Sequence, residues 1–247
     1  VKNWTVHHPL YPERKVCDDV SIKVRKGEVV GISGLMGAGR TELAMSIFGQ
    51  SYGTNISGQL FLDGKEVHLK TIKQAIKNKL AYVTEDRKGN GLVLTNPIKI
   101  NTTLANLDSI SPRMVIDKDK EYPVAEEYRG KLKTKCPTVE QNVGNLSGGN
   151  QQKVLLAKWM FTDPDVLILD EPTRGIDVGA KYEIYCIIND LVAAGKSVIM
   201  ISSELPEVLG MSDRIYIMNE GKIAGELSAE EATQEKIMSI IVSSGKG

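Results

Sequence analysis

Two adjacent glycines in residues 146–152 constrain this chain more than any other feature. Gly148 and Gly149 stand 22 and 21 residues before Asp170, an acidic residue that ends an apolar run. Ser147 can cap the helix predicted at 148–161, and the free amides of the first helical turn then attract an anion. Glycine also lets a phosphate approach the backbone closely. The sequence therefore predicts an anion site at a helix start, at a fixed spacing from an acidic strand end.

A second glycine-rich run, residues 34–41, follows a predicted buried strand and precedes a predicted helix. It matches the phosphate-binding P-loop pattern G-x-x-x-x-G-K-[ST], except that Arg40 takes the place of lysine. Lysine is a compact point charge and arginine a broad planar fork, so this exchange is not conservative. We expect the amides of residues 37–41 to hold a β-phosphate and Thr41 to bind Mg²⁺. The predicted nucleotide-binding residues here are Gly34, Gly37, Ala38, Gly39, Arg40 and Thr41.

Asp170 and Glu171 follow an apolar strand, at the carboxyl end where open α/β sheets place their ligands. We expect Asp170 to hold Mg²⁺ through water and Glu171 to orient or deprotonate an attacking water molecule. The alternative is that both are solvated charges at a strand end. That alternative explains the acidic pair by itself but neither of the two glycine-rich runs.

Apolar runs alternate with helical patterns in the second half of the chain, which predicts a parallel sheet covered by helices. The expected strands are 165–170, 197–202 and 213–218, with helices at 148–161 and 178–194. Residues 20–24 alternate apolar and polar side chains and predict another strand. The polar, proline-punctuated stretch 87–145 predicts a helical insertion, with helices near 99–107 and 119–134.

Composition narrows the function classes. Lys plus Arg is 31 and Asp plus Glu is 31, so the formal net charge is zero, which argues against general nucleic-acid binding. No apolar run approaches the roughly 18 residues of a membrane span. The sequence begins with Val1 instead of methionine, which leaves open that it is a fragment of a longer protein.

Taken together, these runs resemble one family, the ATP-binding-cassette (ABC) ATPases, over essentially the whole chain. The resemblance implies an α/β fold of the P-loop NTPase type, with a RecA-like core around a parallel sheet, an antiparallel β subdomain and a helical insertion. It implies one ABC ATPase domain over residues 1–247. The nucleotide-binding core and β subdomain are expected at 1–86 and 153–247, and the helical subdomain at 87–152. ATP and Mg²⁺ are the implied cofactors.

The resemblance also assigns roles to single residues. In this family a signature run binds the ATP held by a second domain; it is matched here by Leu146, Ser147, Gly148, Gly149 and Gln151. We expect a side chain at Gly149 to block that phosphate. Asp177 matches the D-loop aspartate. Tyr11 matches the aromatic residue that stacks on adenine, with Trp4 as the alternative for that role.

Two more positions depart from the family pattern. Glu85 takes the place of the Q-loop glutamine that touches Mg²⁺, and Ser203 takes the place of the histidine that contacts the γ-phosphate. A serine hydroxyl is shorter than histidine and cannot carry positive charge. With Arg40, three positions on the γ-phosphate side are altered, while the signature run is intact. We therefore expect an ATPase with low activity as an isolated domain.

These departures resemble one branch of the family, the second cassette of bacterial monosaccharide importers, whose ATPases carry two cassettes in one chain. The matching runs are 34–41, 84–88, 145–153, 171–181 and 202–207. The implied partners are the first cassette, membrane permease subunits and, indirectly, a periplasmic or lipoprotein sugar-binding protein, with no nucleic acid. The implied location is the cytoplasmic face of the cell membrane.

Two further hypotheses stay open beside a transport ATPase. The domain could be a regulatory nucleotide-binding module that hydrolyses nothing in its own pocket. It could also be a soluble cassette protein acting in translation or repair, although the neutral charge and the sugar-branch runs argue against that hypothesis. Turnover by the isolated domain, compared with turnover beside the first cassette, separates a transport ATPase from a regulatory module.

Overall fold

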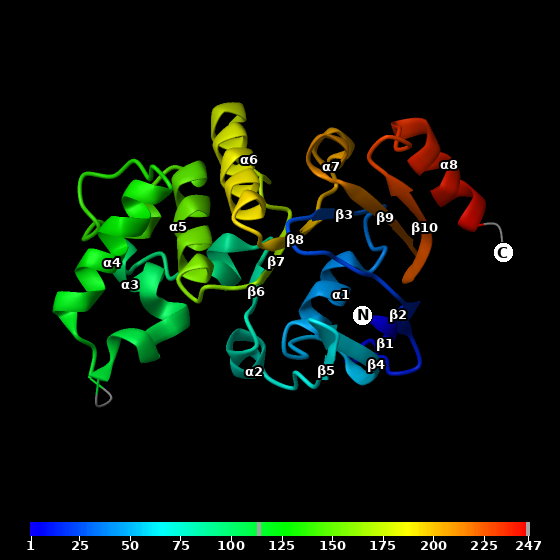
Figure 1. Cartoon of the computed structure of the whole chain (residues 1–247), viewed down its shortest axis with the longest axis horizontal. Helices are drawn as coiled ribbons and strands as arrows, with labels where there is room; N and C mark the ends of the chain where they lie inside the picture. Colours follow the sequence, from blue (N-terminus) through cyan, green and yellow to red (C-terminus); the bar gives the residue numbers. More distant parts are fainter. Residues whose placement is uncertain (113–114, 246–247) are drawn as a thin grey trace. The chain divides into compact units, whose positions relative to one another are not determined.

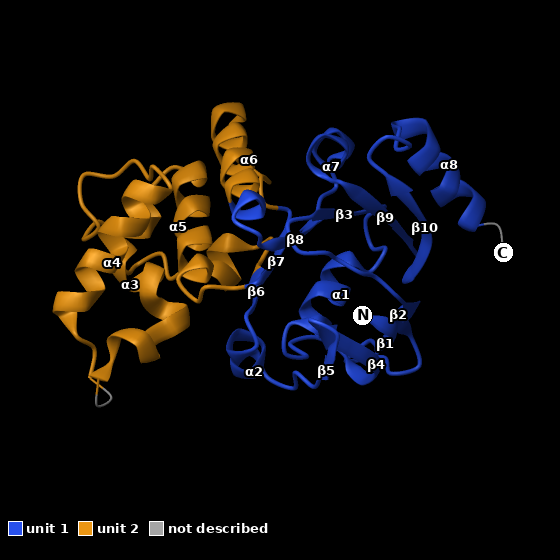
Figure 2. Ribbon diagram, viewed as in Figure 1, with its two compact units in different colours: residues 1–82, 165–171, 191–247 blue, residues 83–164, 172–190 orange. Residues whose placement is uncertain are grey.

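The computed structural model describes residues 1–112 and 115–245, and it divides the chain into two compact units (Figure 2). Unit 1 comprises residues 1–82, 165–171 and 191–247, and unit 2 comprises residues 83–164 and 172–190. Each unit is described below by itself. The expected division into core and helical subdomain at residues 86 and 152 stays a prediction.

Unit 1 is built on a six-stranded sheet in the order β10-β9-β3-β8-β7-β6 (Figure 1). The strands are β3 (Val29–Gly34), β6 (Leu80–Val83), β7 (Val166–Asp170), β8 (Ser197–Ile201), β9 (Arg214–Asn219) and β10 (Lys222–Ser228). Strand β8 pairs in parallel with both β3 and β7, and β3 with β9, while β10 runs antiparallel to β9. Every residue of β8 is buried, as expected for a parallel strand covered on both faces. The predicted parallel sheet is confirmed.

The helices of unit 1 are α1 (Arg40–Ile47), α2 (Ile72–Lys77), α7 (Leu205–Met211) and α8 (Gln234–Ser244). Helices α1 and α7 contact β3 of this sheet, and α8 contacts β9. Ile237 and Ile241, one helical turn apart on α8, are buried in one cluster with Ile215 and Ile217 of β9. The side chain of Thr233 accepts a hydrogen bond from the Lys236 amide and caps α8.

A four-stranded antiparallel sheet, ordered β2-β1-β4-β5, forms the rest of unit 1. Its strands are β1 (Lys2–His7), β2 (Lys15–Val20), β4 (Thr54–Leu62) and β5 (Lys65–Val67). The indole of Trp4 on β1 donates a buried 2.9 Å hydrogen bond to Ser46 on α1, which ties this sheet to the helix after the glycine-rich loop. The expected antiparallel β element is therefore present.

The strand expected at residues 20–24 is wrong. Strand β2 ends at Val20, and the chain beyond it finds other hydrogen-bond partners. The Val1 ammonium group donates to the Ile22 carbonyl oxygen, and the Lys23 amide donates to the hydroxyl of Tyr216. Because these backbone groups are satisfied without a neighbouring strand, the alternating pattern does not lead to a strand.

Unit 2 is mainly helical (Figure 1). Its helices are α3 (Ile98–Thr103), α4 (Lys118–Lys131), α5 (Gly148–Met160) and α6 (Val178–Ala193), with a π turn at Arg87–Gly91 and 3-10 turns at Leu104–Ile110 and Val143–Asn145. The helix predicted near 99–107 is shorter than expected, because Asn106 has a non-helical backbone and its side chain donates to the Phe161 carbonyl oxygen at 3.0 Å. Among the described residues, none of the helices has the length and apolarity needed to cross a membrane.

Candidate functional site

Residues 34–41 form a tight loop between β3 and α1, as the glycine spacing predicts. Gly39 has a φ of +95°, and a Cβ atom there would lie 2.4 Å from the Val16 carbonyl oxygen. A Cβ atom on Gly34 would lie 2.2 Å from the Met218 carbonyl oxygen. Side chains cannot be accommodated at these distances, so both positions require glycine.

The rest of the loop differs in part from the prediction. Gly37 lies at its tip, where an added Cβ atom would meet nothing within 4 Å in the described chain. The Ala38 amide donates to the Leu35 carbonyl oxygen at 3.1 Å, so it is engaged inside the loop instead of pointing to a ligand. The first amides of α1 follow directly and supply the positive end of a helix.

Arg40, the first residue of α1, points toward the acidic pair. Its Nη1 donates to the Ser202 carbonyl oxygen at 2.7 Å, and its Nη2 lies 3.8 Å from Oε1 of Glu171. The side chain is only 10% exposed. An arginine held this way neutralises the site's own carboxylate, a position that differs from the phosphate contact of the P-loop lysine.

Asp170 ends β7 and is fully buried. Burial raises the pKa of Asp170 above its ordinary value, and the hydroxyls of Tyr82 and Thr41 partly oppose that rise. The Tyr82 hydroxyl donates to Oδ2 at 2.9 Å. Oδ1 has no hydrogen-bond partner within the described part of the chain. A buried carboxylate oxygen without a donor fits an oxygen-seeking cation or a water molecule bound to one.

Glu171 follows directly and has a φ of +47°, in the left-handed region. Its Oε2 accepts a 3.0 Å hydrogen bond from the Ser203 hydroxyl. Burial raises the pKa of Glu171, while Ser203 and the Arg40 charge lower it. Ser203 is thus engaged with Glu171, where the sequence predicted a γ-phosphate contact. A largely buried carboxylate with a raised pKa is suited to accept a proton from water.

The residues present fit Mg²⁺. Thr41 supplies a hydroxyl and Asp170 an unpartnered oxygen, both hard ligands, and Mg²⁺ usually keeps water and phosphate oxygens as its other ligands. No group of three or more His, Cys, Asp or Glu able to hold a metal occurs within residues 1–112 and 115–245. Glu85, the third predicted ligand, belongs to unit 2, and its role stays a prediction.

Tyr11 lies on the loop between β1 and β2 and is 57% exposed. Its ring lies 5.2 Å from the ring of His8, centroid to centroid. Trp4, the alternative, is buried and donates to Ser46, so it presents no face to a ligand. Of the two candidates for stacking on adenine, the structure favours Tyr11.

The signature run opens α5 of unit 2, as predicted, and buried Leu146 anchors it. The cap predicted for Ser147 is wrong. Its hydroxyl accepts a 3.0 Å hydrogen bond from the Asn150 side chain and, in the described structure, bonds none of the α5 amides. The amides of the first turn therefore stay available to an anion at the positive end of the helix.

The two signature glycines have different surroundings. A Cβ atom on Gly149 would lie 2.4 Å from Cβ of Ala180 on α6, inside unit 2. A Cβ atom on Gly148 would lie 3.0 Å from Nη2 of Arg87 and 3.2 Å from the Gly175 carbonyl oxygen. We expected a side chain at Gly149 to block a phosphate. The structure gives a different reason for glycine at this position, because a side chain there would strike Ala180 and separate α5 from α6.

Gln151 and Asp177 have positioning roles in unit 2. Gln151 is buried, and its Nε2 donates to the carbonyl oxygens of Val143 and Leu146 at 3.3 and 3.2 Å, so it holds the signature run in place. The carboxylate of Asp177 accepts the Ala180 amide at 2.9 Å and caps the start of α6.

Sequence reasoning did not single out Arg87, which connects the turn at Arg87–Gly91 to the segment before α6. Its Nη1 donates to the Arg174 carbonyl oxygen at 2.8 Å, and its Nη2 donates to that of Gly175 at 3.3 Å, beside Gly148. Burial lowers the pKa of Arg87. Glu85 forms an ion pair with Arg174. The only sequence signal was that Glu85 and Arg87 share the run 84–88.

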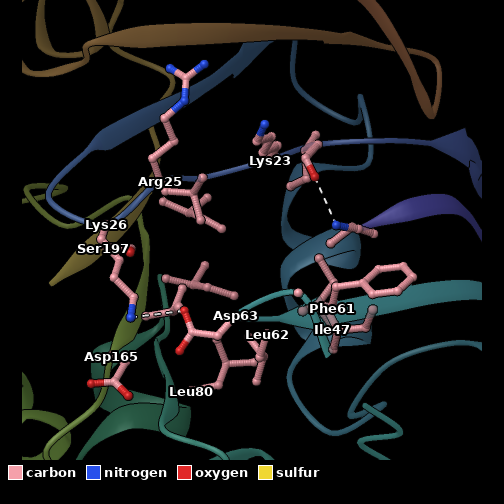
Figure 3. Close-up of a pocket in the computed structure, with 18 of the residues that line it drawn as sticks. Lys23, Arg25, Lys26, Ile47, Phe61, Leu62, Asp63, Leu80, Asp165 and Ser197 are labelled. Atoms are coloured by element: carbon pink, nitrogen blue, oxygen red, sulfur yellow. Dashed lines mark hydrogen bonds and ion pairs between the residues drawn. The ribbon is translucent and has the colours of Figure 1, made fainter. Parts of the chain in front are cut away.

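Unit 1 also contains a cavity of about 1010 Å³ (Figure 3). Lys23, Arg25 and Lys26 lie around an apolar wall that includes Phe61 and Leu80, and Lys26 pairs with Asp63 at 3.1 Å. The lining residues of β7 and β8 are those near the amino ends of the strands, whereas Asp170 and Glu171 follow their carboxyl ends. The cavity is therefore separate from the loop and the acidic pair.

Comparison with known proteins decides the family. Residues 17–174, more than half of the chain, match the family model described as ABC transporter. The chain belongs to the ABC transporter family. Three solved ATP-binding cassettes share this fold with it. One is nucleotide-free, with a TM-score of 0.78 at 22% identity over 98% of this chain and 96% of that chain. Another is in its ADP conformation, with the same TM-score, identity and coverage.

The third is a dimeric cassette in a post-hydrolysis state bound to ADP and Pi, with a TM-score of 0.77 at 19% identity over 92% of this chain and 97% of that chain. All three solved structures are less than 25% identical to this ABC chain, so they show its fold and not its substrate or mechanism. The predicted P-loop NTPase fold is confirmed.

Curated relatives of this ABC chain include the L-arabinose transport ATP-binding protein AraG of Geobacillus stearothermophilus, 61% identical over 98% of this chain. The xylose import ATP-binding protein XylG of Thermoanaerobacter pseudethanolicus is 56% identical over 96%. The ribose import ATP-binding protein RbsA of Clostridium tetani is 50% identical over 91%. The chain spans 47%, 47% and 44% of the length of these relatives, about half in each case.

Proposed function

We propose that this chain is the second nucleotide-binding cassette of a sugar-import ATPase, which couples ATP binding and hydrolysis to monosaccharide uptake. The names of its relatives and its coverage of about half their length support this assignment. The observation that carries it is a contrast between two parts of the chain. The helix start at Ser147 is open to an anion, while Arg40 of the P-loop is already bound to Ser202 and Glu171.

In unit 1, the first amides of α1 would hold the phosphates of ATP, and Thr41 and Asp170 would hold Mg²⁺. When bound, the ion would neutralise phosphate charge. Tyr11 would stack on the adenine base. Glu171 would receive the proton of the attacking water, since burial raises its pKa.

Two contacts weaken that base. The Ser203 hydroxyl and the Arg40 guanidinium both stabilise the charged form of Glu171, and Arg40 is held away from the phosphate contact that the P-loop lysine makes. We therefore infer slow hydrolysis in this chain's own site. The same contacts favour the second candidate, a regulatory module that binds nucleotide without hydrolysing it.

In unit 2, the Ser147 hydroxyl and the amides of α5 would bind the γ-phosphate held by the P-loop of another cassette. Donors placed where negative charge develops contribute most to such a reaction. The proposed partners are the first cassette of the same transporter, permease subunits at the cytoplasmic face of the membrane and, through them, a sugar-binding protein.

The test is ATP turnover by this chain alone and mixed with the first cassette. Alone it should be far below a typical enzyme rate of about 10 s⁻¹. In the mixture, Ser147→Ala in this chain should lower the rate about tenfold or more, since one donor to a developing charge is worth at least that. Ser243→Ala, on an exposed position of α8, is the matched control and should leave the rate unchanged.

Two results would contradict the proposal. One is fast turnover by this chain alone. The other is a mixture in which Glu171→Gln abolishes turnover while Ser147→Ala leaves it intact, because the productive site would then be this chain's own. Nucleotide binding with no turnover in the chain, and no stimulation of the first cassette, would instead support the regulatory module.

A further inference from the structure

Two histidine side chains brace the loop that carries Tyr11: Nδ1 of His7 lies 2.5 Å from the Pro12 carbonyl oxygen, and His8 binds the amides before and at Tyr11. Nδ1 of His8 lies 3.1 Å from the Leu10 amide and 3.2 Å from the Tyr11 amide and accepts both. Pro9 has no N–H, so these are the first two amides available after His8. An Asn or Asp side chain closes a turn in the same way, by accepting a backbone N–H two residues on. His8 therefore holds the amide side of Tyr11, while the Arg14 amide holds the Tyr11 carbonyl oxygen at 2.9 Å.

The same imidazole also contacts two aromatic rings. Its centroid lies 5.2 Å from that of Tyr11 with the planes tilted by 35°, and 6.3 Å from that of Tyr52 in an edge-on arrangement at 86°. Both separations lie in the range at which aromatic pairs attract. Tyr11 remains 57% exposed, so its ring is accessible to a ligand, while the His8 ring next to it also contacts Tyr52.

The strand that follows the Tyr11 loop contacts the loop that we assign to phosphate binding. Burial raises the pKa of Tyr52, and the charge of Glu42, in the first turn of α1, raises it further. Cys17 on β2, the strand that follows the Tyr11 loop, donates through its sulfur to the Gly39 carbonyl oxygen at 3.7 Å. The Tyr11 loop and the P-loop are thus connected through β2 within unit 1.

We propose that His8 is the positioning residue for adenine binding, with Tyr52 as its support. Nδ1 fixes the loop by accepting two amides, and the imidazole ring holds the Tyr11 ring in place for stacking. A ring held in its binding conformation gains affinity because nothing has to be ordered when the base arrives. The inference rests on the proposed function, in which Tyr11 stacks on adenine.

The two contributions of His8 can be separated by substitution. His8→Asn keeps an acceptor for the amides and loses the ring, whereas His8→Phe keeps a ring and loses the acceptor. Tyr11→Ala is the reference for loss of the base contact. His68→Asn and His68→Phe make the same changes at an exposed position of the same unit and are the matched controls.

The measurement is the calorimetric Kd of the chain for Mg-ATP and for inorganic tripolyphosphate, which has no base. Tyr11→Ala should weaken Mg-ATP binding about tenfold, because the base loses the ring on which it stacks. His8→Phe should weaken it about fivefold, as expected if the ordered loop conformation falls to about a fifth of the population. His8→Asn should recover part of that loss. Tripolyphosphate binding should be unchanged throughout.

Each other outcome has a distinct meaning. If Tyr11→Ala weakens Mg-ATP binding and His8→Phe does not, the positioning role is wrong and the proposed function stands. If His8→Phe weakens Mg-ATP and tripolyphosphate equally, His8 only stabilises the fold and the inference is wrong. If Tyr11→Ala has no effect, or the chain binds no nucleotide, the base contact of the proposed function fails and the inference fails with it.

Discussion

Gly149 and Gly130 are both helical glycines of unit 2, and replacing each with alanine should change stability in opposite directions. A Cβ atom at Gly149 of α5 would lie 2.4 Å from Cβ of Ala180 on α6. Apolar carbons pack at about 3.5–4.0 Å, so the two helices would have to separate by about 1 Å or more. At Gly130 of α4, an added Cβ atom meets nothing within 4 Å in the described structure.

The magnitudes follow from these surroundings. Overpacking a core by one carbon costs about 1–3 kcal/mol, and alanine is favoured over glycine in a helix by about 1 kcal/mol. Gly149→Ala should therefore lower the free energy of unfolding by up to about 2 kcal/mol. Gly130→Ala keeps only the helix preference and should raise it by about 0.5–1 kcal/mol.

Thermal and urea denaturation measure both changes. In a chain of this size, 1 kcal/mol moves the melting temperature by about 2–4 °C. A second variant isolates the clash: Ala180→Gly removes the atom that Gly149→Ala would strike, so the double variant should be more stable than the sum of the single changes by about 1 kcal/mol. The reasoning is refuted if Gly149→Ala raises the midpoint as Gly130→Ala does, or if the two changes at positions 149 and 180 are simply additive.

Three other changes test the site itself. Arg40→Lys should raise ATP turnover by the chain about tenfold in a phosphate-release assay, because it frees Glu171 and restores a charge that reaches phosphate; an unchanged rate would count against the ion pair. Burial raises the pKa of Asp170, so above the ordinary pKa of an aspartate the folded chain binds more protons than the unfolded chain, and the free energy of unfolding falls as pH rises. Asp170→Asn should remove this fall in stability. Urea midpoints of the variant that keep the full pH dependence would contradict the raised pKa. Arg87→Ala removes two hydrogen bonds to carbonyl groups and should cost about 1–3 kcal/mol in urea, whereas a silent substitution would show that those bonds are not needed.

The local parts of the site could be predicted from the sequence because they depend on near neighbours. The loop at 34–41, the acidic strand end and the helix opened by Ser147 each follow from residues within a few positions of one another. Their spacing also gave the fold class, since strands that alternate with helices have few other ways to bury both faces.

What could not be predicted depends on partners far along the chain. Arg40 turns toward Ser202, which is 162 residues away, and Arg87 bonds carbonyl groups 87 and 88 residues away. The requirement for glycine at position 149 likewise comes from a distant residue, Ala180 on α6, whose Cβ atom leaves no room for a side chain there. The strand expected at 20–24 failed for the same reason, because Tyr216 on β9 took up a backbone group that the alternating pattern assigns to a neighbouring strand.

The backbone at Glu171 bears on how such a chain changes over generations. A glutamate in the left-handed region is strained by about 1–2 kcal/mol relative to glycine, which adopts that conformation freely. Without a use for the carboxylate, drift would favour glycine or asparagine at this position, because either change stabilises the fold. Under the proposed function, this strain is kept because the Glu171 carboxylate takes part in a slow reaction at this chain's own site. A Glu171→Gly variant that is more stable and loses none of its turnover would remove that conclusion.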